Sequence, residues 1–247
     1  MTGFLLALQF LTIAPVKISG TVESSRFGGS VAYFPVVGFF LGCLLICADG
    51  LLSAFFLNQL LVNVVLVILL MILTGGLHID GLADTFDALL SGKKREEMLE
   101  IMRDSRIGAM GVVAIVSVVL LKLALLSSLG SDGKGPSLIL MCVLGRYSFA
   151  WNLKFFPYAR EEGKAKIFFE GMNNKIFFMA TLISLIFSVA FGGARGAVIF
   201  LMTAAFVVVA GRFIAGKIGG MTGDTLGAVG ELTEVFTLFA ILILSRV

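Results

Sequence analysis

The chain contains long apolar segments that are almost free of charged residues, and these segments limit what it can fold into. Each is close to the ~20 residues that a helix needs to cross the hydrocarbon core of a bilayer. The segments cover residues 30–57, 59–79, 108–130, 136–153, 176–192, 196–216 and 230–246. Only 14% of the 247 residues are charged and 58% are hydrophobic. An ordinary soluble enzyme or a disordered chain is therefore excluded, because the first would expose too much apolar surface and the second needs a polar composition.

The pattern inside these segments predicts helices. Apolar and polar residues do not alternate as they do in the strands of an outer-membrane barrel. We therefore predict an all-α fold, a polytopic integral membrane helical bundle with about seven transmembrane helices, forming a single domain over residues 1–247. The apolar stretch 4–14 is too short to span alone, and it predicts a short interfacial or re-entrant helix ending at Pro15.

The basic residues are sorted to one side of this predicted bundle. Leaving aside Lys122 and Arg146 inside the spans, 14 Lys and Arg residues fall on the side of the N-terminus and three polar loops, and 3 on the other side. The loops are residues 80–107, 154–175 and 217–229. Because basic loops stay in the cytoplasm, we expect a cytoplasmic (inner) membrane protein with its N-terminus and these loops in the cytoplasm. The net charge of +3, without a basic block, predicts no nucleic-acid partner.

The first polar loop begins with three aspartates at helical spacing. Asp80, Asp84 and Asp87 lie at i, i+4 and i+7, which places them on one face of a helix. Carboxylates this close repel one another unless a cation neutralises them, and carboxylate oxygens select a hard ion such as Mg²⁺. The pattern predicts a magnesium site at the membrane edge that serves a phosphate or diphosphate ester, with solvated acids at a helix end as the alternative. The preceding His78 is a candidate base or ligand-orienting residue, or an ordinary interfacial histidine.

Several arginines are candidate phosphate contacts. Arg103 and Arg106 flank Asp104, and glycines then open the next apolar run. Guanidinium groups match phosphate oxygens, and a glycine-opened helix N-terminus adds backbone donors. Positive-inside anchoring is the alternative explanation. Arg160 is a further anion candidate, while Arg146, inside an apolar run, either pairs with an acid or binds a substrate anion.

A glycine-rich loop at residues 219–228 is the third motif. Its glycines permit a tight loop whose amides could face a phosphate, and Thr222 within it is a candidate phosphate contact. Asp224 is a candidate ligand for a second metal ion or a residue that orients the first. Glu231 and Glu234 share one face of the last span, where acids need partners. The alternative is a plain hairpin loop.

Taken in order, these motifs resemble those of the cobalamin synthase family. The matching segments are QFLTIAPV at 9–16, TGGLHIDGLADTFD at 74–87, MRDSRIG at 102–108, Gly145-Arg146, YAREEG at 158–163 and GGMTGDTLGA at 219–228. The resemblance implies a Mg²⁺-dependent integral membrane transferase. It would join adenosylcobinamide-GDP to α-ribazole or α-ribazole 5′-phosphate, giving adenosylcobalamin or its 5′-phosphate and GMP. Further expected partners are the lipid bilayer, a second copy of the chain and other corrinoid-assembly enzymes.

In the mechanism that we expect, the ribose 3′-hydroxyl of α-ribazole attacks the phosphorus attached to cobinamide, and GMP leaves. Mg²⁺ is expected on Asp80, Asp84 and Asp87, and phosphate oxygens on Arg103, Arg106 and Arg160. The general base stays open among His78, Asp104, Asp224 and Glu231.

Three other functions are compatible with clustered acids in a membrane protein. A CDP-alcohol phosphotransferase-like enzyme is disfavoured, because its motif has Arg where this chain has Asp84. A prenyltransferase-like enzyme with an Asp-rich diphosphate site is a related alternative. An ion-coupled transporter would place its acids near the bilayer midplane and would cleave no bond.

Overall fold

The computed structural model describes residues 2–17, 23–55 and 58–245, and over these ranges it contains helices and no β-strand. Residues 56–57 and 246, which end two of the predicted spans, lie outside the described residues. The elements in chain order are α1 (Thr2–Leu11), α2 (Ser24–Ser30), the 3-10 helix η1 (Val31–Tyr33), α3 (Phe34–Phe55), α4 (Gln59–Leu73), α5 (Leu77–Leu89), α6 (Arg95–Ile101), α7 (Ala109–Ser127), α8 (Ser131–Phe155), α9 (Lys166–Glu170), α10 (Asn174–Ile218) and α11 (Gly223–Ser245). The predicted all-helical bundle is confirmed.

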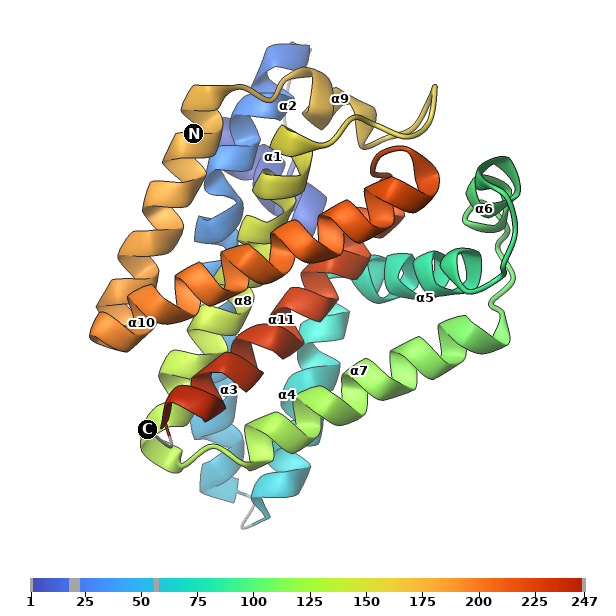
Figure 1. Ribbon diagram of the computed structural model, residues 1–247. Helices are drawn as coiled ribbons and strands as arrows, with labels where there is room; N and C mark the ends of the chain where they lie inside the picture. Colours follow the sequence, from blue (N-terminus) through green and yellow to red (C-terminus); the bar gives the residue numbers. More distant parts are fainter. Residues whose placement is uncertain (1, 18–22, 56–57, 246–247) are drawn as a thin grey trace.

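Helix α8 forms the centre of the bundle. It packs against α3, α10 and α11 (Figure 1), and residues 137–150 are buried without exception. Helix α3 approaches it closely at Gly42, where an added Cβ would lie 2.7 Å from the Ile139 Cα. Small residues let membrane helices approach in this way, because association in lipid depends on packing rather than on the hydrophobic effect.

Fewer helices qualify as membrane spans than the sequence predicts. By length and composition, four helices of the described chain can cross a membrane: Arg26–Phe55, α7, α10 and α11. Helix α8 covers the predicted run 136–153 but is not among them. The runs 176–192 and 196–216 are two arms of α10, which breaks at Gly193 with φ 58° and ψ −143°. Figure 1 shows these arms as the two limbs of a V.

The run 59–79 is also divided. Gly75 and Gly76 have φ of +64° and +70°, a left-handed conformation that glycine adopts without strain. They turn the chain so that α5 lies at 89° to α4, and the two helices would make a fifth span only if counted together. We therefore treat α5 as lying outside the spans. It crosses the bundle and packs against α11 and α7.

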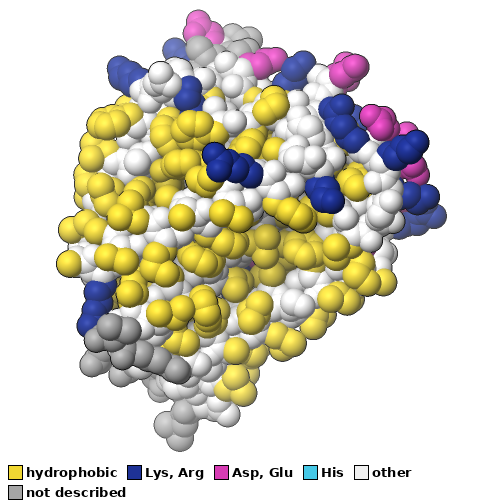
Figure 2. All heavy atoms as spheres, viewed as in Figure 1, with side chains coloured by type: hydrophobic (Ala, Val, Ile, Leu, Met, Phe, Trp, Pro, Cys, Tyr) yellow, Lys and Arg dark blue, Asp and Glu magenta, His cyan; other side chains and the backbone are white. Residues whose placement is uncertain are grey.

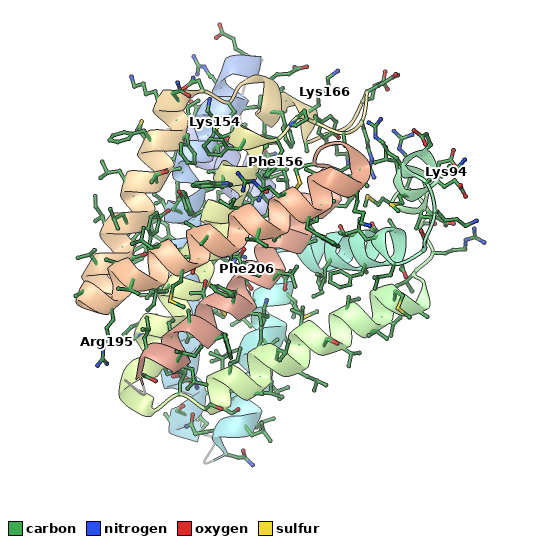
Figure 3. The ribbon with its side chains drawn as sticks, viewed as in Figure 1. Lys94, Lys154, Phe156, Lys166, Arg195 and Phe206 are labelled. Carbon is green, nitrogen blue, oxygen red and sulfur yellow. The ribbon has the colours of Figure 1, made fainter. Side chains whose placement is uncertain are left out.

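Charged side chains gather at one end of the molecule. Figure 2 shows them mostly above an apolar band, at the end where Figure 1 places α2, α6 and α9. Lys94, Lys154 and Lys166 lie toward that end and Arg195 lies toward the other (Figure 3). Helix α1, with 10 residues, is too short to span, as predicted.

Candidate active site

Helices α5 and α11 meet through two glycines, and this contact places the aspartates of both helices side by side. A Cβ added at Gly81 would lie 2.6 Å from the carbonyl oxygen of Asp224, and one added at Gly227 would lie 3.0 Å from the Cα of His78. The glycine in the Asp80-Gly81 motif therefore serves helix packing.

Two loops are tied together beside this contact. The Ala159 amide donates to the Met221 carbonyl at 2.8 Å, and the Met221 amide donates to the Pro157 carbonyl at 2.9 Å. This pairing brings Arg160 next to Asp224, with 2.7 Å between Nη2 and Oδ2. From α6, the Nε of Arg95 donates to the Ile218 carbonyl at 2.7 Å. This role of Arg95 could not be predicted, because three consecutive basic residues at 93–95 give no sign of which one will bind a distant carbonyl.

The aspartates at this contact repel one another, as the sequence predicts. Burial raises the pKa of the Asp84 carboxyl to about 7, and the nearby charges of Asp80, Asp224 and Asp87 add to this rise against the opposing effect of Arg160. Oxygen donors of this kind suit Mg²⁺. Within the described residues, however, no three acidic, His or Cys side chains form a group that could hold a metal ion. Carboxylate oxygens suit the predicted cation, but the described side chains do not form a ready metal site, and Mg²⁺ binding stays a prediction.

Asp87 differs from the other two aspartates of α5. Its Oδ2 accepts the Gly108 amide at 2.7 Å and its Oδ1 accepts the Gly111 amide at 2.8 Å. The carboxylate thus caps the start of α7 and satisfies donors that a helix N-terminus leaves free. The glycine-opened helix N-terminus that the sequence suggests for phosphate is filled by the protein's own carboxylate.

The Arg-Asp-Ser-Arg motif lies in an exposed loop. The Arg106 guanidinium binds both oxygens of Asp104, with 2.6 Å between Nη2 and Oδ2. These hydrogen bonds lower the pKa of Asp104 to about 2. Arg103 is exposed, and its charge acts on Tyr158 beside the contact between the loops. The charge of Arg103 therefore lies near Tyr158, whereas Arg106 is held by Asp104.

Thr222 closes the N-terminus of α11. Its Oγ1 accepts the Thr225 amide at 3.2 Å, and the Thr225 Oγ1 accepts the Thr222 amide at 2.7 Å. Both residues are buried, and such reciprocal bonds are a common way to satisfy the first amides of a helix. The hydroxyl of Thr222 thus serves the helix in this structure, and its contact with phosphate stays a prediction.

Glu231 and Arg146 lie away from the aspartates, in an ion cluster buried inside the bundle. Lys122 Nζ donates to Glu231 Oε2 at 2.6 Å and also to Glu234, and Arg146 Nη1 donates to Glu234. All four side chains are at most 5% exposed. Of the two roles open to Arg146, the structure shows the pairing with an acid.

A cavity of about 240 Å³ lies where α1, α5, α8, the 158–165 loop and α11 meet. Arg160, Asp224 and His78 line it. His78 is 3% exposed, and its Nε2 is buried without a hydrogen-bond partner among the residues that the structure describes. Burial, followed by the charge of Arg146, lowers the pKa of His78 to about 3. The imidazole is therefore neutral near pH 7 and is a weak base.

Comparison with known proteins identifies the family. The cobalamin-5-phosphate synthase (CobS) model matches residues 3–242. The adenosylcobinamide-GDP ribazoletransferase of Acetivibrio thermocellus is 41% identical over 237 residues, which are 95% of this chain and 94% of the relative. The proteins of the same name from Roseiflexus and Caldanaerobacter subterraneus are 38% and 37% identical, covering 94% and 98% of this chain and 86% and 99% of their own lengths.

No solved structure matches the chain. The family match covers the regions that carry all three polar motifs, from the aspartates of α5 to the start of α11. The chain belongs to the cobalamin-5-phosphate synthase family.

Proposed function

We propose that the chain joins adenosylcobinamide-GDP to α-ribazole or its 5′-phosphate, releasing GMP, and that the contact between α5 and α11 is the active site. The family match and the names of the relatives support the reaction. The observation that carries the location is the cluster of aspartates beside a cavity, where burial and the neighbouring carboxylates raise the pKa of Asp84 to about 7. A cation bound together with a diphosphate would relieve the repulsion among these carboxylates.

Asp80 and Asp84 are the residues that would hold Mg²⁺ together with phosphate oxygens of the substrate, because Mg²⁺ is commonly bound by one or two carboxylates and a substrate phosphate. Bound there, the ion would neutralise charge on the diphosphate. Asp87 keeps its two amide contacts and fixes α5 against α7. Asp87 would complete the ligand set only if its carboxylate also contacts the ion.

In the reaction, the ribose 3′-oxygen forms a bond to the cobinamide-side phosphorus, the bond from that phosphorus to the GMP oxygen breaks, and the hydroxyl proton leaves. Arg160 and Arg103 hold phosphate oxygens, because guanidinium groups bind them in a fixed geometry. Arg106 joins them once it releases Asp104.

Of the four candidate bases, Asp224 is the one that we propose to accept the proton. It is the carboxylate that lines the cavity. The pKa of Asp104 is held at about 2 and that of His78 at about 3, which makes both weak bases. Glu231 is hydrogen-bonded to Lys122 inside the bundle.

We further propose that the charged end of the molecule faces the cytoplasm of a cell with a single or inner cytoplasmic membrane. The sorting of basic residues supports this orientation. Both soluble substrates would then reach the site from the cytoplasm, where a second copy of the chain or other corrinoid-assembly enzymes could deliver them.

The test is a reaction with purified protein, adenosylcobinamide-GDP, α-ribazole and Mg²⁺, in which GMP and the cobalamin product are quantified. We expect equal amounts of both, and we expect Asp80→Asn to abolish GMP release while the protein stays folded. Glu97→Gln makes the same chemical change at an exposed residue bonded to Lys93, and it should leave the rate unchanged. Absence of product from the wild-type protein would refute the proposed function.

The three alternative functions, a transporter, a CDP-alcohol phosphotransferase and a prenyltransferase, are less well supported. A transporter would use ionisable groups inside the spans as binding sites, but Lys122, Arg146, Glu231 and Glu234 are bonded to one another there. Neither the CDP-alcohol phosphotransferase nor the prenyltransferase alternative is favoured by any contact in the site, and the family match supports the ribazole transferase.

A further inference from the structure

The cavity beside the aspartates has an aromatic wall that the catalytic residues do not explain. Phe10 from α1 and Phe149 from α8 line it together with Tyr158. Phe10 stacks on Phe34 with ring centroids 5.8 Å apart, and Phe34 meets Phe149 edge-on at 6.1 Å. These rings hold one another in place, so the wall is a rigid apolar surface suited to a flat ring.

His78 also lines the cavity, and one of its ring nitrogens is left unsatisfied by the described residues. Its ring lies 5.1 Å from that of Phe149, and its buried Nε2 has no partner within the described chain. Buried polar atoms are rarely left without a hydrogen bond, because the loss of water is then uncompensated. A ligand that offers a single nitrogen from an otherwise apolar ring would satisfy it.

The lining of the cavity becomes basic on the side of the 158–165 loop. Arg160 and Lys164 line it there, and Lys164 is exposed to solvent. A ligand that fits this cavity therefore has an apolar aromatic ring at one end and a phosphate or a polar sugar at the other.

We propose that this cavity binds the base of the acceptor nucleoside, with the benzimidazole ring against Phe149 and Phe10 and its free ring nitrogen bonded to His78 Nε2. This assignment rests on the proposed function and specifies which of the two substrates occupies the cavity. The ribose then lies toward Asp224, and the 5′-phosphate, when present, lies against Lys164.

The guanine of the donor is the competing occupant, and the polar groups disfavour it. Guanine carries N–H donors on its ring edge and needs several acceptors, whereas the benzimidazole of α-ribazole has no N–H donor. The carboxylate that lines the cavity, Asp224, is already bound to Arg160 at 2.7 Å. Phe10, Phe149 and His78 line this part of the cavity, and within the described chain the Nε2 of His78 is buried there without a partner.

The first test uses His78→Phe, which keeps an aromatic ring and removes the nitrogen. Loss of one hydrogen bond to the substrate should raise the KM for α-ribazole by about tenfold, with the KM for adenosylcobinamide-GDP unchanged. Equilibrium dialysis of the full chain with 5,6-dimethylbenzimidazole alone should show weaker binding by the same factor. A rise in the KM for adenosylcobinamide-GDP, with that for α-ribazole unchanged, would assign the cavity to the donor and overturn the proposal.

Because His78 is buried, a second variant at an exposed position keeps the test decisive. Lys164→Gln should raise the KM for α-ribazole 5′-phosphate more than the KM for α-ribazole, since only the first presents a phosphate to Lys164. Equal changes for both substrates would contradict the predicted orientation. If the wild-type protein releases GMP but neither variant alters the acceptor KM, this assignment fails and the proposed function stands. If the wild-type protein releases no GMP, the proposed function itself fails.

Discussion

Two groups of carboxylates in this bundle differ in what faces them. Inside the bundle, Glu231 and Glu234 are hydrogen-bonded to Lys122 and Arg146, so two acids meet two cations. Where α5 meets α11, four aspartates lie near one another, and Arg160 is bound to Asp224. The first group is neutralised by the protein itself, whereas the second keeps an excess of negative charge.

This difference separates a structural role from a functional one. Charged side chains are tolerated in an apolar interior when each has an oppositely charged partner. Removing one partner leaves the other as an uncompensated buried charge. Unbalanced acids at an accessible site cost stability, which is a common feature of sites that bind a ligand. We infer that the buried group holds α7, α8 and α11 together. We also infer that the aspartates form a binding site for a cation and a diphosphate.

The largest expected effect comes from Glu234→Ala in the buried group. The change leaves Arg146 and Lys122 without that carboxylate, which should lower the free energy of unfolding by about 3–5 kcal/mol. Thermal unfolding in detergent measures this change, and Glu97→Gln, at an exposed pair, is the control with little expected effect. A Glu234→Ala protein as stable as the control would show that the buried group is not a structural clamp.

The next largest effect is expected for GMP release by a variant of Asp84. Asp84→Asn should lower the rate of GMP release by about 100- to 1,000-fold, the loss that follows removal of one preorganised electrostatic contact. Its unfolding temperature should stay the same or rise, because the variant loses a charge that its neighbours repel. A marked loss of stability would place Asp84 with the structural acids.

The loss of stability in Asp87→Asn should be smaller than that in Glu234→Ala and larger than that in Asp84→Asn. In Asp87→Asn, one of the two amides of α7 would face an NH₂ group in place of a carboxylate oxygen. We expect a stability loss of about 1–2 kcal/mol, in the range of a lost helix cap. The measurement is the same thermal unfolding, run beside Asp84→Asn. If Asp87→Asn is as stable as Asp84→Asn, the cap formed by Asp87 does not contribute to the stability of the fold.

The smallest effect is expected at the exposed pair Asp104–Arg106. The pKa of Asp104 is lowered to about 2, below its ordinary value of about 3.9. Such a group stabilises the fold above pH 4, and this contribution disappears as the pH falls toward 2. Because the pair is exposed and screened by solvent, this contribution is small, so Arg106→Ala should lower the unfolding temperature only slightly from pH 5 to 8 and not at all near pH 2. A large decrease from pH 5 to 8 would mean that the loop is coupled to the bundle.

The sequence predicts the parts of this structure that depend on local spacing. The i, i+4, i+7 pattern places Asp80, Asp84 and Asp87 on one helix. The bend between α4 and α5 at Gly75 and Gly76 was not predicted, because the apolar run 59–79 continues through it. The apolar runs predict the helices, although the break at Gly193 within α10 could not be distinguished from a loop between two spans.

The contacts between distant residues could not be predicted. Lys122 and Glu231 are separated by 109 positions, and Arg146 and Glu234 by 88. A single sequence shows that each buried charge needs a partner but not which one it finds. The cap formed by Asp87 was missed for the same reason, because its partners lie on another helix.

The most direct test of the difference between the two groups is binding of Mn²⁺, a hard cation in place of Mg²⁺, followed by electron paramagnetic resonance in the presence of GDP. We expect the wild-type protein and Glu97→Gln to bind the ion and Asp84→Asn to bind it at least about tenfold more weakly. Equal Mn²⁺ binding by the wild-type protein and Asp84→Asn would contradict the claim that these aspartates form a cation site.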